Sequence, residues 1–157
     1  MPPFTDLERH LLSLGVAPLR GDHFVPTSAG VWARLKLPPD ARVPEALRWF
    51  VARFGGCKFR GGAFYLDAKA GGDVMVGWFL DEEKLVSTRE AYRESLPAEV
   101  VLLSNDGGDN HLAVGVGPAN SGVVYFHLHD APLDRNLYVI DESFEHFLGA
   151  LHRETPT

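Results

Sequence analysis

The chain has 157 residues, of which 45% are apolar, and its formal net charge is −6. This length allows one domain with a substantial core but is short for two ordinary domains, so we expect a single domain over residues 1–157. The one cysteine, Cys57, excludes an intramolecular disulfide, and no apolar run is long enough to cross a bilayer. These features favour a cytoplasmic protein that does not bind membranes.

The first third of the chain predicts two amphipathic helices. Leucines recur at helical spacing from Leu7 to Leu14, and Gly15 follows as a stop. A second apolar stripe runs from Val43 to Phe54, with Pro44 near its start and Gly55 directly after it. Both helices are expected to pack an apolar face against a shared core.

The remaining two thirds alternate glycine turns with short apolar runs, which predicts strands. The capping-box sequence Ser87-Thr88-Arg89-Glu90 predicts a brief helix through Glu94. A terminal helix is expected to bury Phe144, Phe147, Leu148 and Leu151. The expected strands are residues 63–66, 74–80, 100–103, 111–116, 122–128 and 137–140. Strands and helices that do not strictly alternate indicate the α+β fold class.

Charge is distributed unevenly along the chain. Residues 1–80 contain ten Lys/Arg and seven Asp/Glu, whereas residues 81–157 contain five and fourteen. An acidic half favours encounter with a basic protein and opposes binding to nucleic acid phosphates. The alternative is a solvated acidic surface that serves solubility alone.

The sharpest candidate for chemistry is His127-Leu128-His129-Asp130. Residues two apart on a strand share a face, so His127 and His129 could converge on a metal if His111 or Asp109 supplied a third ligand. The alternative is that both histidines are partly exposed strand residues and that Asp130 caps the next turn. Because three ligands at a defined spacing are absent, we expect no metal, no cofactor and no catalytic residues.

The run from Asn105 to Asn110 offers oxygen ligands but lacks the terminal Glu of a calcium loop, so a plain glycine turn is favoured. Cys57 has no recognisable partnered base and is interpreted as an ordinary small side chain. The chain also contains no Gly-x-Ser-x-Gly elbow and no Walker lysine. These observations favour a binding protein over a hydrolase or nucleotidase.

The second half of the chain contains an ordered succession of motifs. They are Leu96-Pro97, the strand from Val100 to Leu103, the turn from Asn105 to Asn110, Gly122-Val123-Val124-Tyr125-Phe126, and Ser143-Phe144-Glu145-His146-Phe147-Leu148. This succession resembles the SUKH superfamily, the homology group of cell-wall regulators and bacterial immunity proteins. An earlier Leu37-Pro38, before the helix that ends at a glycine pair, extends the resemblance over residues 37–152 and leaves residues 1–36 as an N-terminal helix and extension.

The resemblance implies a mixed, mostly antiparallel sheet with flanking helices and a noncatalytic protein-binding role. We expect an immunity protein, a monomer or weak homodimer, that masks the active surface of a basic toxin domain, often a nuclease. A regulatory scaffold in cell-wall or envelope control is the first alternative, and a metal-dependent enzyme using His127 and His129 is the second. Charge alone selects the expected partner-binding residues, which are Asp81, Glu82, Glu83, Asp106, Asp109 and Asp130.

Overall fold

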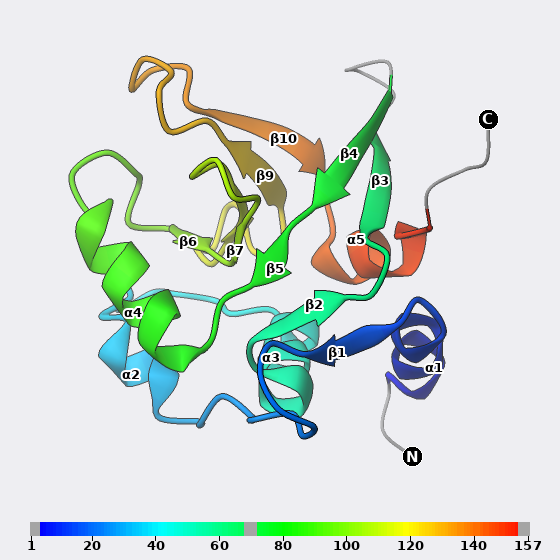
Figure 1. Ribbon diagram of the computed structural model, residues 1–157. Coiled ribbons are helices and arrows are strands. Elements are labelled where there is room, and N and C mark those ends of the chain that lie inside the picture. The colour runs from blue at the N-terminus through cyan, green and yellow to red at the C-terminus, as the bar shows by residue number, and fades with distance from the viewer. Residues whose placement is uncertain (1–3, 68–71, 154–157) are drawn as a thin grey trace.

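The structure is a computed structural model that describes residues 4–67 and 72–153 (Figure 1). Within these residues, five helices and ten strands confirm the α+β class. The helices are α1 (Thr5–Ser13), α2 (Val31–Arg34), α3 (Glu45–Phe54), α4 (Glu82–Ala91) and α5 (Phe144–Ala150). The strands are β1 (Val16–Pro18), β2 (Cys57–Phe59), β3 (Ala63–Asp67), β4 (Gly72–Val76), β5 (Trp78–Phe79), β6 (Val100–Leu102), β7 (Ser104–Asn105), β8 (His111–Gly115), β9 (Val124–His127) and β10 (Leu137–Asp141).

All strand pairs between these elements are antiparallel. One sheet has the order β1-β2-β5-β7, a second has the order β10-β9-β8-β6, and β3 and β4 form a separate hairpin. Figure 1 shows this hairpin beside α5, and α4 beside α2 on the opposite side of the molecule. No helix within the described residues has both the length and the apolar character that a bilayer crossing requires.

Aromatic rings join the helices to the first sheet at the centre of the core. Phe50 of α3 lies 4.8 Å from Phe79 of β5 and 5.8 Å from Phe144 of α5, measured between ring centroids. All three side chains are buried. Edge-to-face contacts of this kind add to the free energy gained by burying the rings, so this cluster fixes how α3 and α5 sit against the sheet.

The terminal helix forms as the sequence predicts. The Ser143 hydroxyl accepts a hydrogen bond of 3.1 Å from the His146 amide, which satisfies one of the free N–H groups at the start of α5. Phe144, Phe147 and Leu148 are buried on one side of the helix. The first helix and α3 are likewise confirmed, with Pro44 as the N-cap residue of α3.

The predicted strand over residues 74–80 is wrong in one respect, because Gly77 divides it. A Cβ atom at Gly77 would lie 1.9 Å from the Asn105 carbonyl oxygen, so only glycine allows this close approach of two backbones. The division leaves β4 in the hairpin and β5 in the first sheet. Gly77 therefore lets one apolar run contribute to two different sheets.

The helix predicted from Ser87 to Glu94 begins earlier than expected. α4 spans Glu82–Ala91, and the Asp81 carboxylate accepts a 2.9 Å hydrogen bond from the Lys84 amide as its cap. Ser87 lies inside the helix, where its hydroxyl donates to the Lys84 carbonyl. The prediction that the helix starts at the Ser87 capping box is wrong. Asp81 caps the helix instead, and the two acidic residues that follow it, Glu82 and Glu83, suit the positive end of the helix dipole.

Candidate functional site

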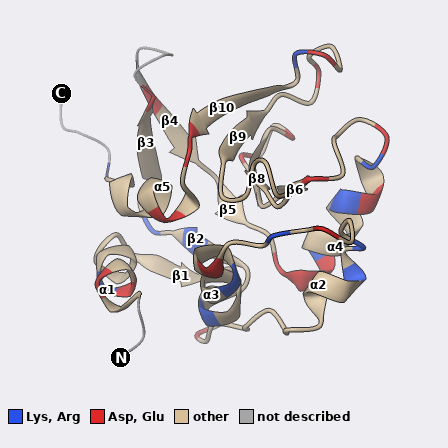
Figure 2. Ribbon diagram, turned by 180° about the vertical axis from the view of Figure 1, so that it is seen from behind, with Lys and Arg blue, Asp and Glu red and all other residues tan. Residues whose placement is uncertain are grey.

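The six acidic residues expected to bind a partner fall into two groups. Asp81, Glu82 and Glu83 form the start of α4, whereas Asp106, Asp109 and Asp130 lie in loops of the strand region. The other end of α4 contacts the strand region, because the C-cap residue Tyr92 lies 5.2 Å from His111. A ten-residue helix is about 15 Å long, and the start of α4 follows β5, whose Trp78 pairs with Asn105 beside Asp106. Figure 2 also shows acidic and basic segments interleaved along α4.

The carboxylates at the start of α4 are largely satisfied within the protein. Arg34 donates to Glu82 Oε2 at 2.7 Å and to both carboxylate oxygens of Glu83, at 2.9 and 3.0 Å. The other oxygen of Glu82 accepts a 2.7 Å hydrogen bond from the Ser28 amide. These contacts tie α2 to α4 and leave little free negative charge for a partner.

The pKa values follow from these contacts. Hydrogen bonds from the Ser28 backbone, and then from Arg34, hold the pKa of Glu82 below its usual value. The hydrogen bond from Arg34 lowers the pKa of Glu83. The pKa of Arg34 is raised in turn, mainly through Glu83. This group of charges is therefore ionised at neutral pH and structural in character, although its solvent exposure keeps its contribution to stability small.

The second acidic group is built on a tight turn between β7 and β8. The Asp106 carboxylate accepts hydrogen bonds from the amides of Gly108 at 2.8 Å and Asn110 at 3.3 Å, which closes the turn. Asp109 has a φ of 62°, in the left-handed region that Asp and Asn tolerate better than most residues. The turn that the sequence predicts here is confirmed, and it holds Asp109 on the surface.

Asp130 and Trp78 lie beside this turn. The Asn110 side-chain oxygen accepts a 3.2 Å hydrogen bond from the His129 amide, which brings Asp130 to the turn. Trp78 pairs with Asn105 and is 41% exposed. We call Asp106, Asp109, Asp130 and Trp78 the acidic loop surface. Within the described residues, its three carboxylates form no ion pair with Lys or Arg, and an exposed aromatic ring lies beside them, a composition that suits a contact with a basic protein.

The two histidines of the predicted metal pair do not share a strand face. β9 ends at His127, and the Nδ1 atom of His129 lies 3.1 Å from the Asn110 side-chain oxygen in the following loop. His127 instead pairs with His111 across the sheet, with 3.0 Å between the two Nδ1 atoms. No group of three or more His, Cys, Asp or Glu side chains that could hold a metal occurs among residues 4–67 and 72–153.

The His111–His127 pair is buried under Tyr92. The two imidazoles stack with 5.2 Å between ring centroids, and the Tyr92 ring covers both at 5.2 and 5.1 Å. Burial, followed by the charge of His127, lowers the pKa of His111 to about 4, although Asp109 and Asp106 act in the opposite direction. Burial, followed by His129, lowers the pKa of His127. At neutral pH, one neutral ring therefore donates to the other.

Cys57 is fully buried in the core, and burial raises the pKa of its thiol. A thiol with a raised pKa is a poor nucleophile at neutral pH. The interpretation of Cys57 as a small core side chain thus agrees with its position in β2 against Phe79.

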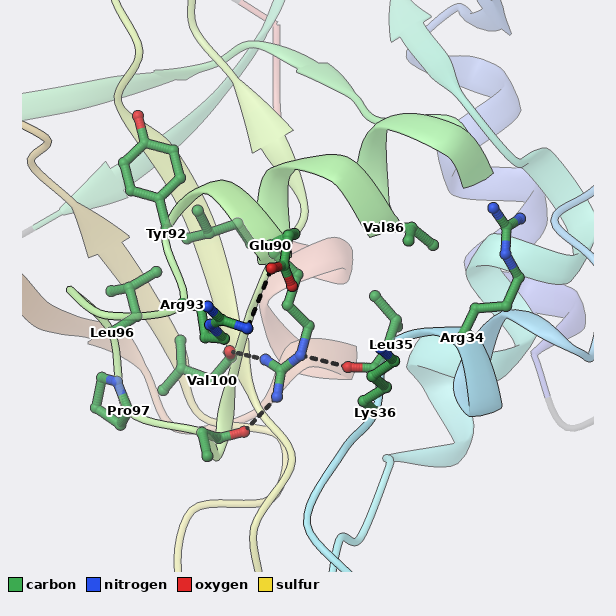
Figure 3. A pocket seen from close by; sticks show the side chains of 13 residues that line it. Arg34, Leu35, Lys36, Val86, Glu90, Tyr92, Arg93, Leu96, Pro97 and Val100 are labelled. Carbon is green, nitrogen blue, oxygen red and sulfur yellow. Dashed lines mark hydrogen bonds and ion pairs between the residues drawn. The ribbon is translucent and has the colours of Figure 1, made fainter.

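A pocket beside α4 is the site that sequence reasoning missed. It has a volume of about 530 Å³ and lies between α4, the turn after α2 and the start of β6 (Figure 3). Arg89 crosses it, donating to the carbonyl oxygens of Leu35 at 2.6 Å, Val100 at 2.9 Å and Ala98 at 2.9 Å. The only signal in the sequence was Arg89 itself, whose long-range carbonyl partners no local pattern identifies.

The fold and these sites define a small α+β protein whose candidate functional features are binding surfaces. Residues 40–148 match the SUKH_6 family model, described as SMI1-KNR4 cell-wall. The match covers well over half of the 157 residues, and the chain belongs to the SUKH superfamily. Comparison with curated proteins gave no match.

Proposed function

We propose that this SUKH protein is a noncatalytic, cytoplasmic immunity protein that neutralises a basic toxin domain by covering its active surface. The observation that carries the proposal is the family match over residues 40–148. The superfamily includes immunity proteins as well as cell-wall regulators. The structure adds support through its surface charge: the acidic half of the chain presents Asp106, Asp109 and Asp130 on adjoining loops.

The acidic loop surface is the proposed contact region. A toxin that acts on nucleic acid presents Lys and Arg to bind phosphates, so the carboxylates of the acidic loop surface would attract that same toxin surface. Trp78 would supply the desolvated anchor at the centre, since exposed aromatic side chains carry much of the binding free energy at protein interfaces. The carboxylates at the start of α4 are less suited, because Arg34 already pairs with two of them.

Affinity purification of the tagged protein from its native cells, followed by mass spectrometry of partners eluted with salt, tests the proposal. We expect a basic toxin-like domain near equal stoichiometry, released as the salt concentration rises, because screening weakens contacts between exposed charges. Recovery of the protein alone from cells that produce a toxin would contradict the proposal.

The contact region is tested separately with a matched pair of variants. Asp106→Asn, Asp109→Asn and Asp130→Asn together remove three charges and retain the side-chain oxygen that closes the turn. The control variant, Asp22→Asn with Glu94→Gln and Glu142→Gln, removes three exposed charges elsewhere. We expect association with the recovered partner to slow by about tenfold in the first variant and to change by less than about twofold in the control. If both triple variants slowed association equally, the acidic loop surface would not be the contact region.

A regulatory scaffold in cell-wall control is the second candidate, favoured by the cell-wall description of the matching family. The same purification distinguishes the two functions. Endogenous envelope-synthesis or signalling proteins in place of a toxin would favour the scaffold.

A further inference from the structure

The pocket beside α4 carries more positive than negative charge, although the chain as a whole is acidic. Its only carboxylate, Glu90, lies 3.1 Å from Arg93 in an exposed pair three residues apart. Such pairs contribute little and exchange partners readily. Within the residues that the structure describes, neither Lys36 nor Arg89 forms an ion pair. Lys36 and Arg89 therefore lie at the pocket without a directly paired carboxylate, although the charge of Glu99 acts on Arg89 from a greater distance.

Arg89 is the unusual member of this group. Its side chain is partly buried, and its three observed hydrogen bonds all go to neutral carbonyl groups. A guanidinium has five N–H donors, so two remain beyond these three bonds. A cation held away from water is costly unless an anion compensates it, and carbonyl dipoles compensate it only in part. The position of Arg89 thus suits a further, negatively charged group.

The rest of the pocket is apolar. Leu35, Val100 and Leu102 are buried beneath it, and Tyr92 and Leu96 are partly buried at its side. Figure 3 shows Leu96 and Val100 on one side and Leu35 and Lys36 on the other. The Arg89 guanidinium links the two sides through its hydrogen bonds to the Leu35 and Val100 carbonyl oxygens. A volume of about 530 Å³ is within the range of small-molecule sites, which pair an apolar lining with a few polar groups.

We propose that this pocket binds a small organic anion, a single carboxylate attached to an apolar body. The carboxylate lies by Arg89, with Lys36 and Arg93 at the rim, and the apolar body covers Leu96, Val100 and Tyr92. A basic protein partner does not fit this pocket, because like charges would oppose each other. The proposal is independent of toxin binding, which uses the acidic loop surface.

Two compounds with the same tail and opposite charge test the proposal. Sodium octanoate and octyltrimethylammonium are titrated into the isotopically labelled full chain, and the backbone amide signals are followed by NMR. We expect octanoate to shift signals of residues 35–36 and 86–102 and to saturate with a dissociation constant of about 1 mM, as is reasonable for a ligand of this size. Octyltrimethylammonium should give no saturable shift in these residues.

A charge-reversal variant, Lys36→Glu with Arg93→Glu, is expected to weaken octanoate binding by about tenfold or more. Both positions are exposed, so the variant keeps its fold, which the dispersion of the NMR signals verifies. Arg9→Glu with Arg135→Glu is the control, since it makes the same charge change at side chains that are each 76% exposed elsewhere. No saturable shifts up to about 20 mM octanoate, shifts centred outside the pocket, equal binding of both compounds, or equal weakening in both variants would each overturn the proposal.

Discussion

The buried His111–His127 pair predicts that the protein loses stability as the pH falls below 6.5. Both histidines have a folded-state pKa below the ordinary value of 6.5, with His111 at about 4. The unfolded chain therefore binds more protons than the folded one throughout this interval. The stabilising effect of the neutral pair is fully present above about pH 6.5 and is lost progressively as the pH falls towards the folded-state pKa of about 4.

The magnitude follows from the pKa of His111. One pKa unit corresponds to about 1.4 kcal/mol, so a shift from 6.5 to about 4 would contribute about 3 kcal/mol if the pair were wholly screened from water. His129 lies close by and is 36% exposed, which brings solvent near the pair. Allowing for solvent screening, we expect a loss of about 1–2 kcal/mol in the free energy of unfolding between pH 6.5 and pH 4.5.

Urea denaturation followed by far-ultraviolet circular dichroism at a series of pH values measures this loss. His111→Phe with His127→Phe removes both titrating rings together and leaves neither nitrogen unpaired, so it should lose about 1–2 kcal/mol less than wild type over this interval. His23→Gln, at an exposed position, is the control and should behave as wild type. The same pH dependence in wild type and in the double variant would refute the reasoning.

Three stability predictions follow from single contacts, each measured as a change in the urea midpoint. Gly77→Ala places a Cβ against the Asn105 carbonyl and should cost about 3 kcal/mol or more, so a neutral effect would contradict the close approach. Asp81→Ala removes the cap of α4 and should cost about 1 kcal/mol, whereas Ser87→Ala should cost less than about 0.5 kcal/mol. A larger loss for Ser87→Ala than for Asp81→Ala would show that Ser87, and not Asp81, caps the helix. Leu148→Ala removes a fully buried side chain and should cost about 2–5 kcal/mol. A loss below about 0.5 kcal/mol, as for a surface substitution, would contradict this prediction.

The parts of the fold that depend on local pattern could be predicted from the sequence. The stripe from Val43 to Phe54 and the Ser143 cap each combine helical spacing with a start or stop signal, and both helices form. The Asp/Gly/Asn turn is also confirmed, because its hydrogen bonds link neighbours in sequence. The order of these local elements was sufficient to indicate the family that the residue 40–148 match shows.

The errors concern contacts between distant residues. The division at Gly77 depends on the backbone of Asn105, which no local pattern around residue 77 reveals. His127 was paired in the prediction with His129, two residues away, but the sheet register places it opposite His111. Arg34 likewise reaches Glu82 and Glu83 from α2, so two residues selected as free charges are ion-paired. The pocket at Arg89 was missed for the same reason.

Inhibition of a recovered partner tests the central proposal most directly. The purified partner is assayed for toxin activity, such as cleavage of nucleic acid, while increasing amounts of the SUKH protein are added at low and high salt. Masking through the acidic loop surface predicts complete inhibition at a one-to-one ratio, a weaker effect at high salt, and a higher requirement for the variant with Asp106→Asn, Asp109→Asn and Asp130→Asn. A partner that keeps its full activity in the complex, or inhibition that salt and these substitutions leave unchanged, would contradict the account.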